Sequence, residues 1–445
     1  MRINLTDNSI ARSEAATFHR RDVAALFPIA DKKIAQLCRE NENLLIFPYS
    51  VETSRDRIGE ESVMSIQNTE DPEKVWIRTG NVMGFIGVGN LQVKIKSRFD
   101  EGRDDFMLHY MLQKVLSFNL FDLSHNNEQE DVFDLIIFMF PYFLKKALRQ
   151  GVYREYQRFK YNDANVKGTI DLGRHITRNI PFMGRIAYTT REYSHDNSMM
   201  ELVRHTIEFM KTKRYGSAVL NIDRETRENV KVIIENTPSY DRNERSSIVG
   251  KNLRCKNHPY YTEYMPLRSL CLQILRMEEV KYGESEDEIC GILFDGAWLW
   301  EEYLSTILEP MGFQHPHNKQ GKGGFFIYED NTGYRMPDFY RKDFVLDAKY
   351  KRLEEKDRIS ELEVSDQNQM IVYLKHLKVQ EGGFVCPLNK REQLALPQAR
   401  LKSGHEHIAI YGIQIPDTAD DFVSFSEMMR VQEESLKDRI EKSID

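Results

Sequence analysis

The chain has 445 residues, and its 62 Lys and Arg against 69 Asp and Glu give a formal net charge of −7. A negative total excludes binding to nucleic acid through overall charge, so any DNA contact requires a local basic surface. Five scattered cysteines exclude a disulfide framework and favour a reducing compartment; they are Cys38, Cys255, Cys271, Cys290 and Cys386.

No segment predicts membrane insertion or export. The longest apolar stretch, residues 132–144, is interrupted by Asp134 and Pro141 and is shorter than the ~20 residues needed to cross a bilayer. It predicts a buried, kinked helix. The N-terminus lacks the apolar core of a signal peptide, so we expect a cytoplasmic protein that does not contact a membrane.

Residues 1–125 predict an α+β region. A short helical segment is expected over 21–45, followed by strands around 75–77, 83–88 and 91–95. Gly89 and Asn90 are typical of the two-residue turn of a β-hairpin.

Residues 126–285 predict a mainly helical middle region, with helices over 199–210, 223–235 and 266–280 and an exposed loop over 236–254. Its notable feature is a run of basic residues interleaved with aromatic ones. The basic residues are Arg154, Arg158, Lys160, Lys167, Arg174, Arg178, Arg185 and Arg191, and the aromatic ones are Tyr156, Phe159, Tyr161, Phe182 and Tyr188. Such a run fits either phosphate contacts on DNA or a solvated face beside a partner.

Residues 286–425 predict an α/β domain with a mixed central sheet flanked by helices. A helix is expected over 293–308, and strands over 383–387 and 408–413. Residues 426–445 predict a charged tail, either helical or disordered.

The strongest chemical signal lies in this third region. Pro337-Asp338 precedes Asp347-Ala348-Lys349, with Asp338 nine residues before Asp347. The second motif lies on a predicted strand, where Asp347 and Lys349 point to the same face. Asp338 can reach that face from the neighbouring hairpin strand.

These residue types suit phosphodiester hydrolysis. Two carboxylates, with the carbonyl of Ala348 as a further ligand, can hold Mg2+, which prefers oxygen ligands, and Mn2+ could substitute. The metal would activate water, while Lys349 orients it and offsets charge on phosphorus. The alternative is a solvated hairpin with ordinary surface charges.

Two helices flank this strand pair. On the first, Glu301 lies at the margin of an apolar stripe, where it either faces the site and joins the two aspartates around the metal or forms a surface ion pair. On the second, with Ser365 as predicted N-cap, Asp366, Gln369 and Tyr373 share a face. Gln369 and Tyr373 would bind DNA phosphate or support the lysine; otherwise Tyr373 is core and Gln369 solvated.

Other motifs in the sequence give weaker indications of function. Cys255-x-x-His258 is half a zinc site without a second half. His315, His317, His405 and His407 are expected at the surface. The sequence contains no Gly-x-x-x-x-Gly-Lys-Ser/Thr motif, so we do not expect the chain to hydrolyse nucleotide alone.

The order of Glu301, Asp338, Asp347-Ala348-Lys349, Gln369 and Tyr373 resembles the PD-(D/E)xK nuclease superfamily. More narrowly, LWEEYL, LDAKYK and DQNQMIVY resemble the McrC family, the nuclease subunits of modification-dependent restriction systems. The segments at 84–99 and 165–171 resemble the N-terminal part of that family.

This resemblance implies a Mg2+-dependent endonuclease acting on double-stranded DNA with a McrB-like AAA+ GTPase ring. It also implies that residues 1–125 dock on the ring and stimulate it. Two alternatives remain open: a non-catalytic adaptor that bridges a motor to DNA, and a stand-alone repair or recombination nuclease.

Overall fold

The computed structural model describes residues 2–9, 16–41, 44–48, 58–88, 91–100, 105–116, 128–213, 216–253, 258–281, 289–316, 323–353, 356–389, 396–402 and 404–443. The chain forms two compact units. Unit 1 combines Met1–Asn126 with Gly283–Asp445, and unit 2 is Asn127–Tyr282. Unit 1 therefore contains both the predicted first region and the segment with the chemical motifs.

The first sheet of unit 1 contains a strand from late in the sequence. Its order is β1 (Arg2–Thr6), β7 (Leu91–Lys96), β6 (Val82–Val88), β11 (Ile289–Asp295) and β3 (Leu44–Phe47). β11 is antiparallel to β6 and parallel to β3, whereas β1 is parallel to β7. Strand β11 therefore leads directly into the helix that begins after Asp295.

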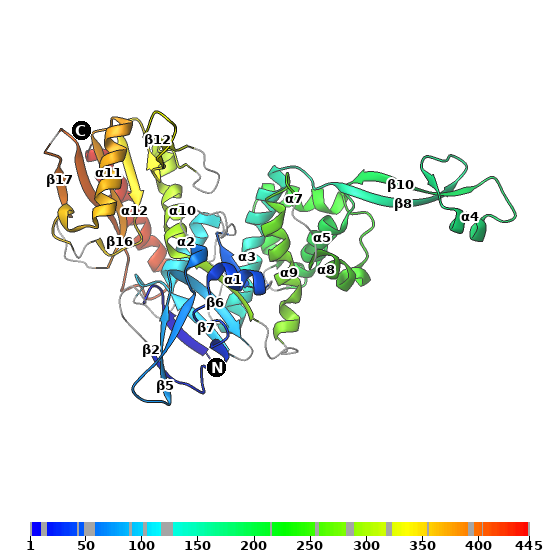
Figure 1. Ribbon diagram of the computed structural model, residues 1–445, viewed down its shortest axis with the longest axis horizontal. Coiled ribbons are helices and arrows are strands. Elements are labelled where there is room, and N and C mark those ends of the chain that lie inside the picture. The colour runs from blue at the N-terminus through cyan, green and yellow to red at the C-terminus, as the bar shows by residue number, and fades with distance from the viewer. Residues whose placement is uncertain are drawn as a thin grey trace. The chain divides into compact units, whose positions relative to one another are not determined.

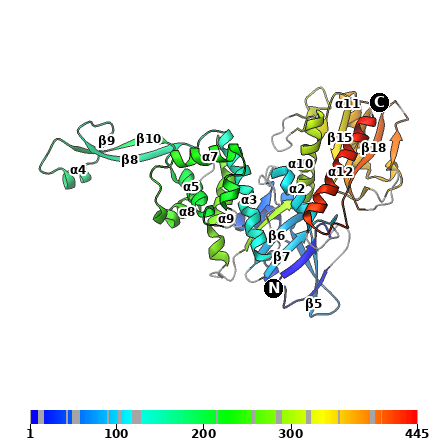
Figure 2. The same cartoon turned by 180° about the vertical axis from the view of Figure 1, so that it is seen from behind.

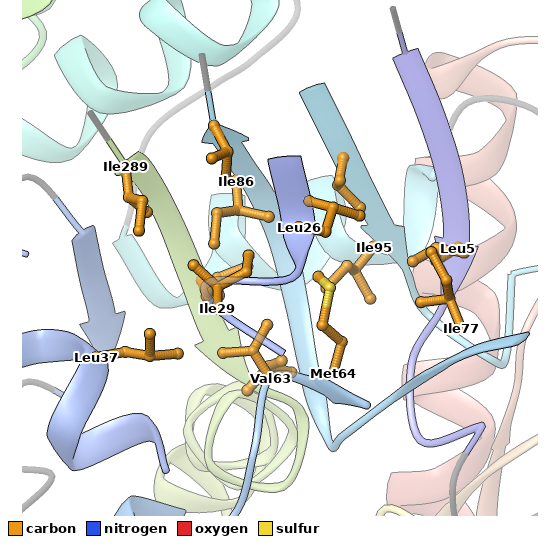
Figure 3. Close-up of a cluster of buried hydrophobic side chains, with 14 of the residues drawn as sticks. Leu5, Leu26, Ile29, Leu37, Val63, Met64, Ile77, Ile86, Ile95 and Ile289 are labelled. Carbon is orange, nitrogen blue, oxygen red and sulfur yellow. The ribbon is translucent and has the colours of Figure 1, made fainter. Parts of the chain in front are cut away.

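A second sheet packs with the first around a shared core. It consists of β2 (Ala16–His19), β5 (Lys74–Thr79) and β4 (Met64–Asn68), all antiparallel. Apolar side chains from both sheets and from the segments between them, including Leu26, Leu37, Ile77, Ile86 and Ile95, fill the space shown in Figure 3. Burial of this apolar surface is the main stabilising contribution of the region.

The predicted strands of the first region are confirmed, but the helical segment over 21–45 is largely wrong. It contains the 3-10 helix η1 (Ala24–Leu26), α1 (Ile34–Glu40) and strand β3. Pro28 explains the early interruption, because proline lacks the N–H and restricts the residue before it. β6 and β7 form the expected hairpin, while the turn at Gly89 and Asn90 lies outside the described residues.

Three helices connect this sheet region to the C-terminal part of unit 1: α2 (Phe106–Leu116), α10 (Gly296–Leu308) and α12 (Phe422–Lys442), which contact one another. The predicted helix over 293–308 starts later than expected, because residues 293–295 belong to β11. The segment predicted as a charged tail, residues 426–445, is helical and forms most of α12. It packs against the rest of unit 1, because Met429, Leu436 and Ile440 are fully buried.

The C-terminal sheet is mixed and flanked by helices, as expected. Its order is β14 (Phe339–Tyr340), β15 (Phe344–Ala348), β16 (Glu381–Leu388), β18 (His407–Gln414) and β17 (Gln398–Arg400). The two inner pairings are parallel and the two outer ones antiparallel. α11 (Val364–Leu377) and α12 lie on opposite faces of the sheet (Figures 1 and 2).

Smaller elements complete unit 1. They are η2 (Ile58–Glu60), η4 (Glu309–Met311), η7 (Ile359–Glu361) and the short pair β12 (Phe325–Phe326) and β13 (Tyr334–Arg335).

Unit 2 is mainly helical, and its expected helices are confirmed as α3 (Glu128–Arg149), which contains Pro141, α5 (Ser198–Met210), α7 (Arg224–Glu235) and α9 (Tyr264–Lys281). Two further helices, α6 (Gly216–Leu220) and α8 (Arg245–Leu253), were not predicted. The expected loop over 236–254 is wrong, because it contains η3 (Arg242–Glu244) and α8. Ile248 and Asn252, one turn apart, are buried and anchor α8.

The basic and aromatic run forms an arm of unit 2. β8 (Glu155–Asp163) and β10 (Ile186–Ser194) pair along their whole length, and the arm also holds β9 (Thr169–Ile170) and α4 (Leu172–Arg178). Figure 1 shows the arm running away from the helices of unit 2. Its far part exposes large apolar side chains: Leu172, Ile176, Ile180, Phe182 and Met183.

In the part of the chain that the structure describes, none of the helices combines the length and the apolar character needed to span a lipid bilayer.

Candidate active site

Asp338 lies just before the short strand β14, where the antiparallel pairing with β15 brings it beside the second motif. Its Oδ2 accepts a hydrogen bond of 2.7 Å from the main-chain N–H of Ala348. Because this bond fixes one carboxylate oxygen against the strand, the Pro-Asp and Asp-Ala-Lys motifs form one local structure.

Asp347 and Lys349 point to the same face of β15, as the strand spacing predicts. Lys349 Nζ lies 2.7 Å from Asp347 Oδ2, and Asp347 is 1% exposed. Burial raises the pKa of Asp347, although the nearby Lys349 opposes that rise. Burial alone would lower the pKa of Lys349, but Asp347, Asp366 and Asp338 outweigh it and raise that pKa above its usual value, so the ammonium stays charged.

Asp366 is a further member of this cluster. From the first turn of α11, its Oδ1 lies 3.1 Å from Lys349 Nζ and its Oδ2 lies 3.2 Å from Lys351 Nζ. The residue is buried, so the lysine is held between two carboxylates on different elements. The sequence placed Asp366 on the face of Gln369 and Tyr373 but did not predict its contact with Lys349.

Gln369 and Tyr373 are joined to each other, one turn apart on α11. Gln369 Nε2 donates to Tyr373 Oη at 2.6 Å, and this hydroxyl donates to the carbonyl of Met336 at 2.8 Å. Burial first, and then the charge of Asp347, raises the pKa of Tyr373, which keeps the hydroxyl protonated. Tyr373 therefore anchors the segment that leads to Asp338.

The predicted N-cap of this helix is wrong. α11 begins at Val364 with Glu363 as the cap residue, and Ser365 lies inside the first turn.

Glu301 lies on α10, next to the fully buried Trp300, whose indole N–H donates to the carbonyl of Val385 at 3.1 Å. Glu301 Oε1 is 3.8 Å from Nε2 of His315. Nδ1 of the same histidine is 2.9 Å from the carbonyl of Asp338. His315 thus lies between Glu301 and Asp338.

The expectation that His315 is a surface residue is wrong, since its side chain is only 4% exposed and its ring stacks on Phe339. Sequence periodicity could not predict the burial of His315, because this residue follows η4 in an irregular segment. His405 is exposed, and His407 pairs with Glu381 at 2.8 Å. His317 and Cys255 lie outside the described residues.

The carboxylate oxygens of Asp338 and Asp347 are the type of ligand that a hard divalent cation such as Mg2+ prefers. The ammonium of Lys349 also lies beside the buried carboxylate of Asp347. Across the described ranges, no three His, Cys, Asp or Glu side chains form a ready metal site. A bound Mg2+ would therefore take remaining ligands from a carbonyl such as that of Ala348, from water and from phosphate, which is its usual mode in proteins.

Three comparisons with known proteins bear on this chain. The family model described as the McrBC 5-methylcytosine restriction system component matches residues 77–387, which include every predicted site residue. No curated protein matches the chain significantly.

Among solved structures, a Thermococcus gammatolerans half-complex of McrB AAA+ hexamers with bound McrC matches at 15% identity. It covers 98% of this chain and 100% of that chain, with a TM-score of 0.48. The Thermococcus gammatolerans McrBC complex matches at 14% identity over 69% of this chain and 87% of that chain, with a TM-score of 0.32. Because the family model covers more than half of the sequence, the chain belongs to the McrBC 5-methylcytosine restriction system component family, which confirms the McrC resemblance.

Proposed function

We propose that this chain is the Mg2+-dependent DNA endonuclease subunit of a McrBC-like restriction complex, with a PD-(D/E)xK nuclease domain. The observation that carries the proposal is the hydrogen bond from the main-chain N–H of Ala348, on β15, to the carboxylate of Asp338, which directly precedes the neighbouring strand β14. This contact brings two carboxylates and one ammonium to the same end of β15, which is what phosphodiester hydrolysis requires.

Each residue has a distinct task in this proposal. Asp338, Asp347 and the carbonyl of Ala348 would hold Mg2+, together with Glu301. The bound metal would supply Lewis acidity and lower the pKa of water. Lys349 orients the attacking water and offsets negative charge on the phosphate, because its ammonium is held in place before reaction.

Gln369 and Tyr373 keep the Pro-Asp segment in position or contact the DNA backbone. The two uses are compatible, because the Gln369 amide retains a second N–H and a carbonyl oxygen besides its bond to Tyr373.

The proposed partners are double-stranded DNA and a McrB-like AAA+ GTPase ring. Residues 1–125 would dock on the ring and stimulate it, and the ring would supply GTP hydrolysis, for which this sequence has no P-loop motif. The basic arm of unit 2 suits either DNA phosphates or a partner surface, as its sequence indicates.

The test is cleavage of modified double-stranded DNA by the full chain with the partner ring, GTP and Mg2+. We expect Asp338→Asn and Lys349→Ala to abolish cleavage while stimulation of the ring's GTPase persists. Matched controls are Asp343→Asn and Lys342→Ala, in the hairpin turn at the other end of β15, which we expect to cleave normally. Full cleavage by Asp338→Asn or Lys349→Ala would refute the catalytic assignment, and stimulation without any cleavage by the wild-type chain would favour the adaptor.

A further inference from the structure

A buried polar network joins the first sheet of unit 1 to the main chain that follows Lys349. Its centre is Arg98, two residues after β7 and 5% exposed. Arg98 Nη1 contacts Asp7 Oδ2 and Asn81 Oδ1, each at 3.1 Å. Its other terminal nitrogen, Nη2, donates to the main-chain carbonyl of Tyr350. One guanidinium thus connects two segments of the first sheet region to the end of the motif strand.

Tyr350 is held by its side chain as well as by its carbonyl. Its Oη lies 2.6 Å from Oγ of Ser97, the guanidinium of Arg98 lies 4.3 Å from its ring centroid, and the ring of Phe99 meets it edge-on at 4.9 Å. In return, Arg352 Nη2 donates to the carbonyl of Arg98 at 2.9 Å. The chain immediately after Lys349 is therefore bound to residues 97–99 through both Tyr350 and Arg352.

The same network reaches the helix that carries Glu301. Asn81, which accepts from Arg98, donates through Nδ2 to Asp295 Oδ1 at 3.2 Å, and its carbonyl accepts from the N–H of Gly296 at 3.0 Å. Asp295 is the N-cap of α10. The first sheet region thus fixes the start of α10 and the end of the Asp-Ala-Lys strand through adjacent hydrogen bonds.

Arginine suits this place for a physical reason. The planar guanidinium presents several N–H groups in a fixed arrangement, so it can hold a carboxylate, an amide oxygen and a carbonyl at once, which a lysine ammonium on a flexible stem does not reproduce. The pair with Asp7 is buried on both sides, with side chains 4% and 0% exposed. Separating it would leave an unpaired buried charge, so the arrangement resists displacement.

We propose that Arg98 is a positioning residue for the nuclease centre. It fixes the main chain at Tyr350 and thereby holds the Lys349 ammonium in register with Asp347 and the scissile phosphate. This inference rests on the proposed function for its effect on catalysis, whereas its structural part, the immobilisation of residues 349–352, can be measured without cleavage.

The kinetic experiment uses the full chain with its partner ring, Mg2+ and GTP. A displacement of about 1 Å at a reacting group costs about 100-fold in rate, so we expect Arg98→Lys to lower kcat by about 10-fold to 100-fold while KM for DNA stays unchanged. Arg341→Lys is the matched control. Arg341 also donates to a carboxylate, Asp343, at 2.8 Å and to a carbonyl, that of Met311, at 3.1 Å, but at the other end of β15, so kcat should stay at the wild-type value.

The second readout is amide hydrogen exchange of the peptide spanning residues 344–352, which does not depend on activity. The Lys349 N–H is bonded to the carbonyl of Val385 at 2.9 Å, and we expect Arg98→Lys, but not Arg341→Lys, to accelerate exchange around it. Asp7→Asn, which preserves shape and removes only the charge that orients Arg98, serves if Arg98→Lys does not fold and should change exchange in the same direction.

The outcomes separate the two claims. Wild-type kcat and wild-type exchange in both Arg98→Lys and Asp7→Asn would overturn the positioning role. A wild-type chain that never cleaves DNA would overturn the proposed function, and the exchange measurement would still decide whether Arg98 immobilises the strand end. Equal acceleration of exchange across all of unit 1 would also overturn the proposal, because it would indicate general loosening.

Discussion

Glu433 on α12 provides the most quantitative prediction, because its buried carboxylate holds three helices together. Its Oε1 accepts hydrogen bonds from the hydroxyls of Tyr110 on α2 and Tyr303 on α10, both at 2.8 Å, and its Oε2 accepts one from Lys114 at 2.8 Å. Burial first, and then Glu433, raises the pKa of both tyrosines, so each hydroxyl is a donor at neutral pH. Glu433→Leu would leave both donors without this acceptor.

The magnitude follows from those contacts. A buried hydroxyl without an acceptor costs about 1–3 kcal/mol, so two give roughly 2–6 kcal/mol. The pair with Lys114, whose side chain is 31% exposed, adds at most about 1 kcal/mol. We therefore expect Glu433→Leu to lower the free energy of unfolding of unit 1 by about 4 kcal/mol. Glu433→Gln keeps an acceptor for both hydroxyls and should cost only about 1 kcal/mol.

Tryptophan fluorescence during urea unfolding isolates the relevant unit. Trp76, Trp298 and Trp300 are the only tryptophans in the sequence, and all three belong to unit 1. Lys114→Met is the control for the exposed pair and should behave like Glu433→Gln. If Glu433→Leu cost no more than Glu433→Gln, the two tyrosine hydroxyls would not depend on this carboxylate, and the reasoning would fail.

Three further predictions concern other parts of the chain. Burial, assisted by Arg245, lowers the pKa of His205 to about 4, so unit 2 should lose stability as pH falls from about 6.5, where an unfolded histidine takes its proton, to about 4; thermal unfolding followed by circular dichroism should show this, and His205→Phe should flatten it. Gly84→Ala should destabilise unit 1 by about 2 kcal/mol or more, measured by urea unfolding, because φ is +127° and a Cβ would lie 2.3 Å from the carbonyl oxygen of Ile292. Tyr373→Phe removes the bond to the carbonyl of Met336 and should lower kcat for DNA cleavage by about 10-fold, with unchanged kcat arguing against an anchoring role.

Local patterns predicted the elements whose residues interact mainly with near neighbours. The short apolar stretches at 75–77, 83–88 and 408–413 were correctly predicted as strands, because such runs are typical of strands buried in a sheet. The loop expected over 236–254 failed because its polar composition hid the buried pair Ile248 and Asn252. Placement of β11 in the first sheet could not be foreseen, since its pairing with β6 joins segments about 200 residues apart and its pairing with β3 joins segments about 250 residues apart.

The same limit applies to the candidate site. Strand geometry alone placed Asp347 and Lys349 on one face, and helical spacing placed Gln369 beside Tyr373. The contacts of Asp366 with Lys349 and of His315 with Asp338 arise from tertiary packing, which no spacing rule reports. Arg98 escaped notice for a similar reason, because its partners lie at positions 7, 81 and 350.

In the proposed nuclease centre, Asp338 and Asp347 together hold a divalent cation beside Lys349. The most direct measurement is a crystal structure of the chain with Mn2+, located by its anomalous signal. We expect a peak within coordination distance, about 2.0–2.2 Å, of carboxylate oxygens from both aspartates. A well-diffracting crystal at saturating Mn2+ with no peak there, or with the ion bound by other residues, would contradict it.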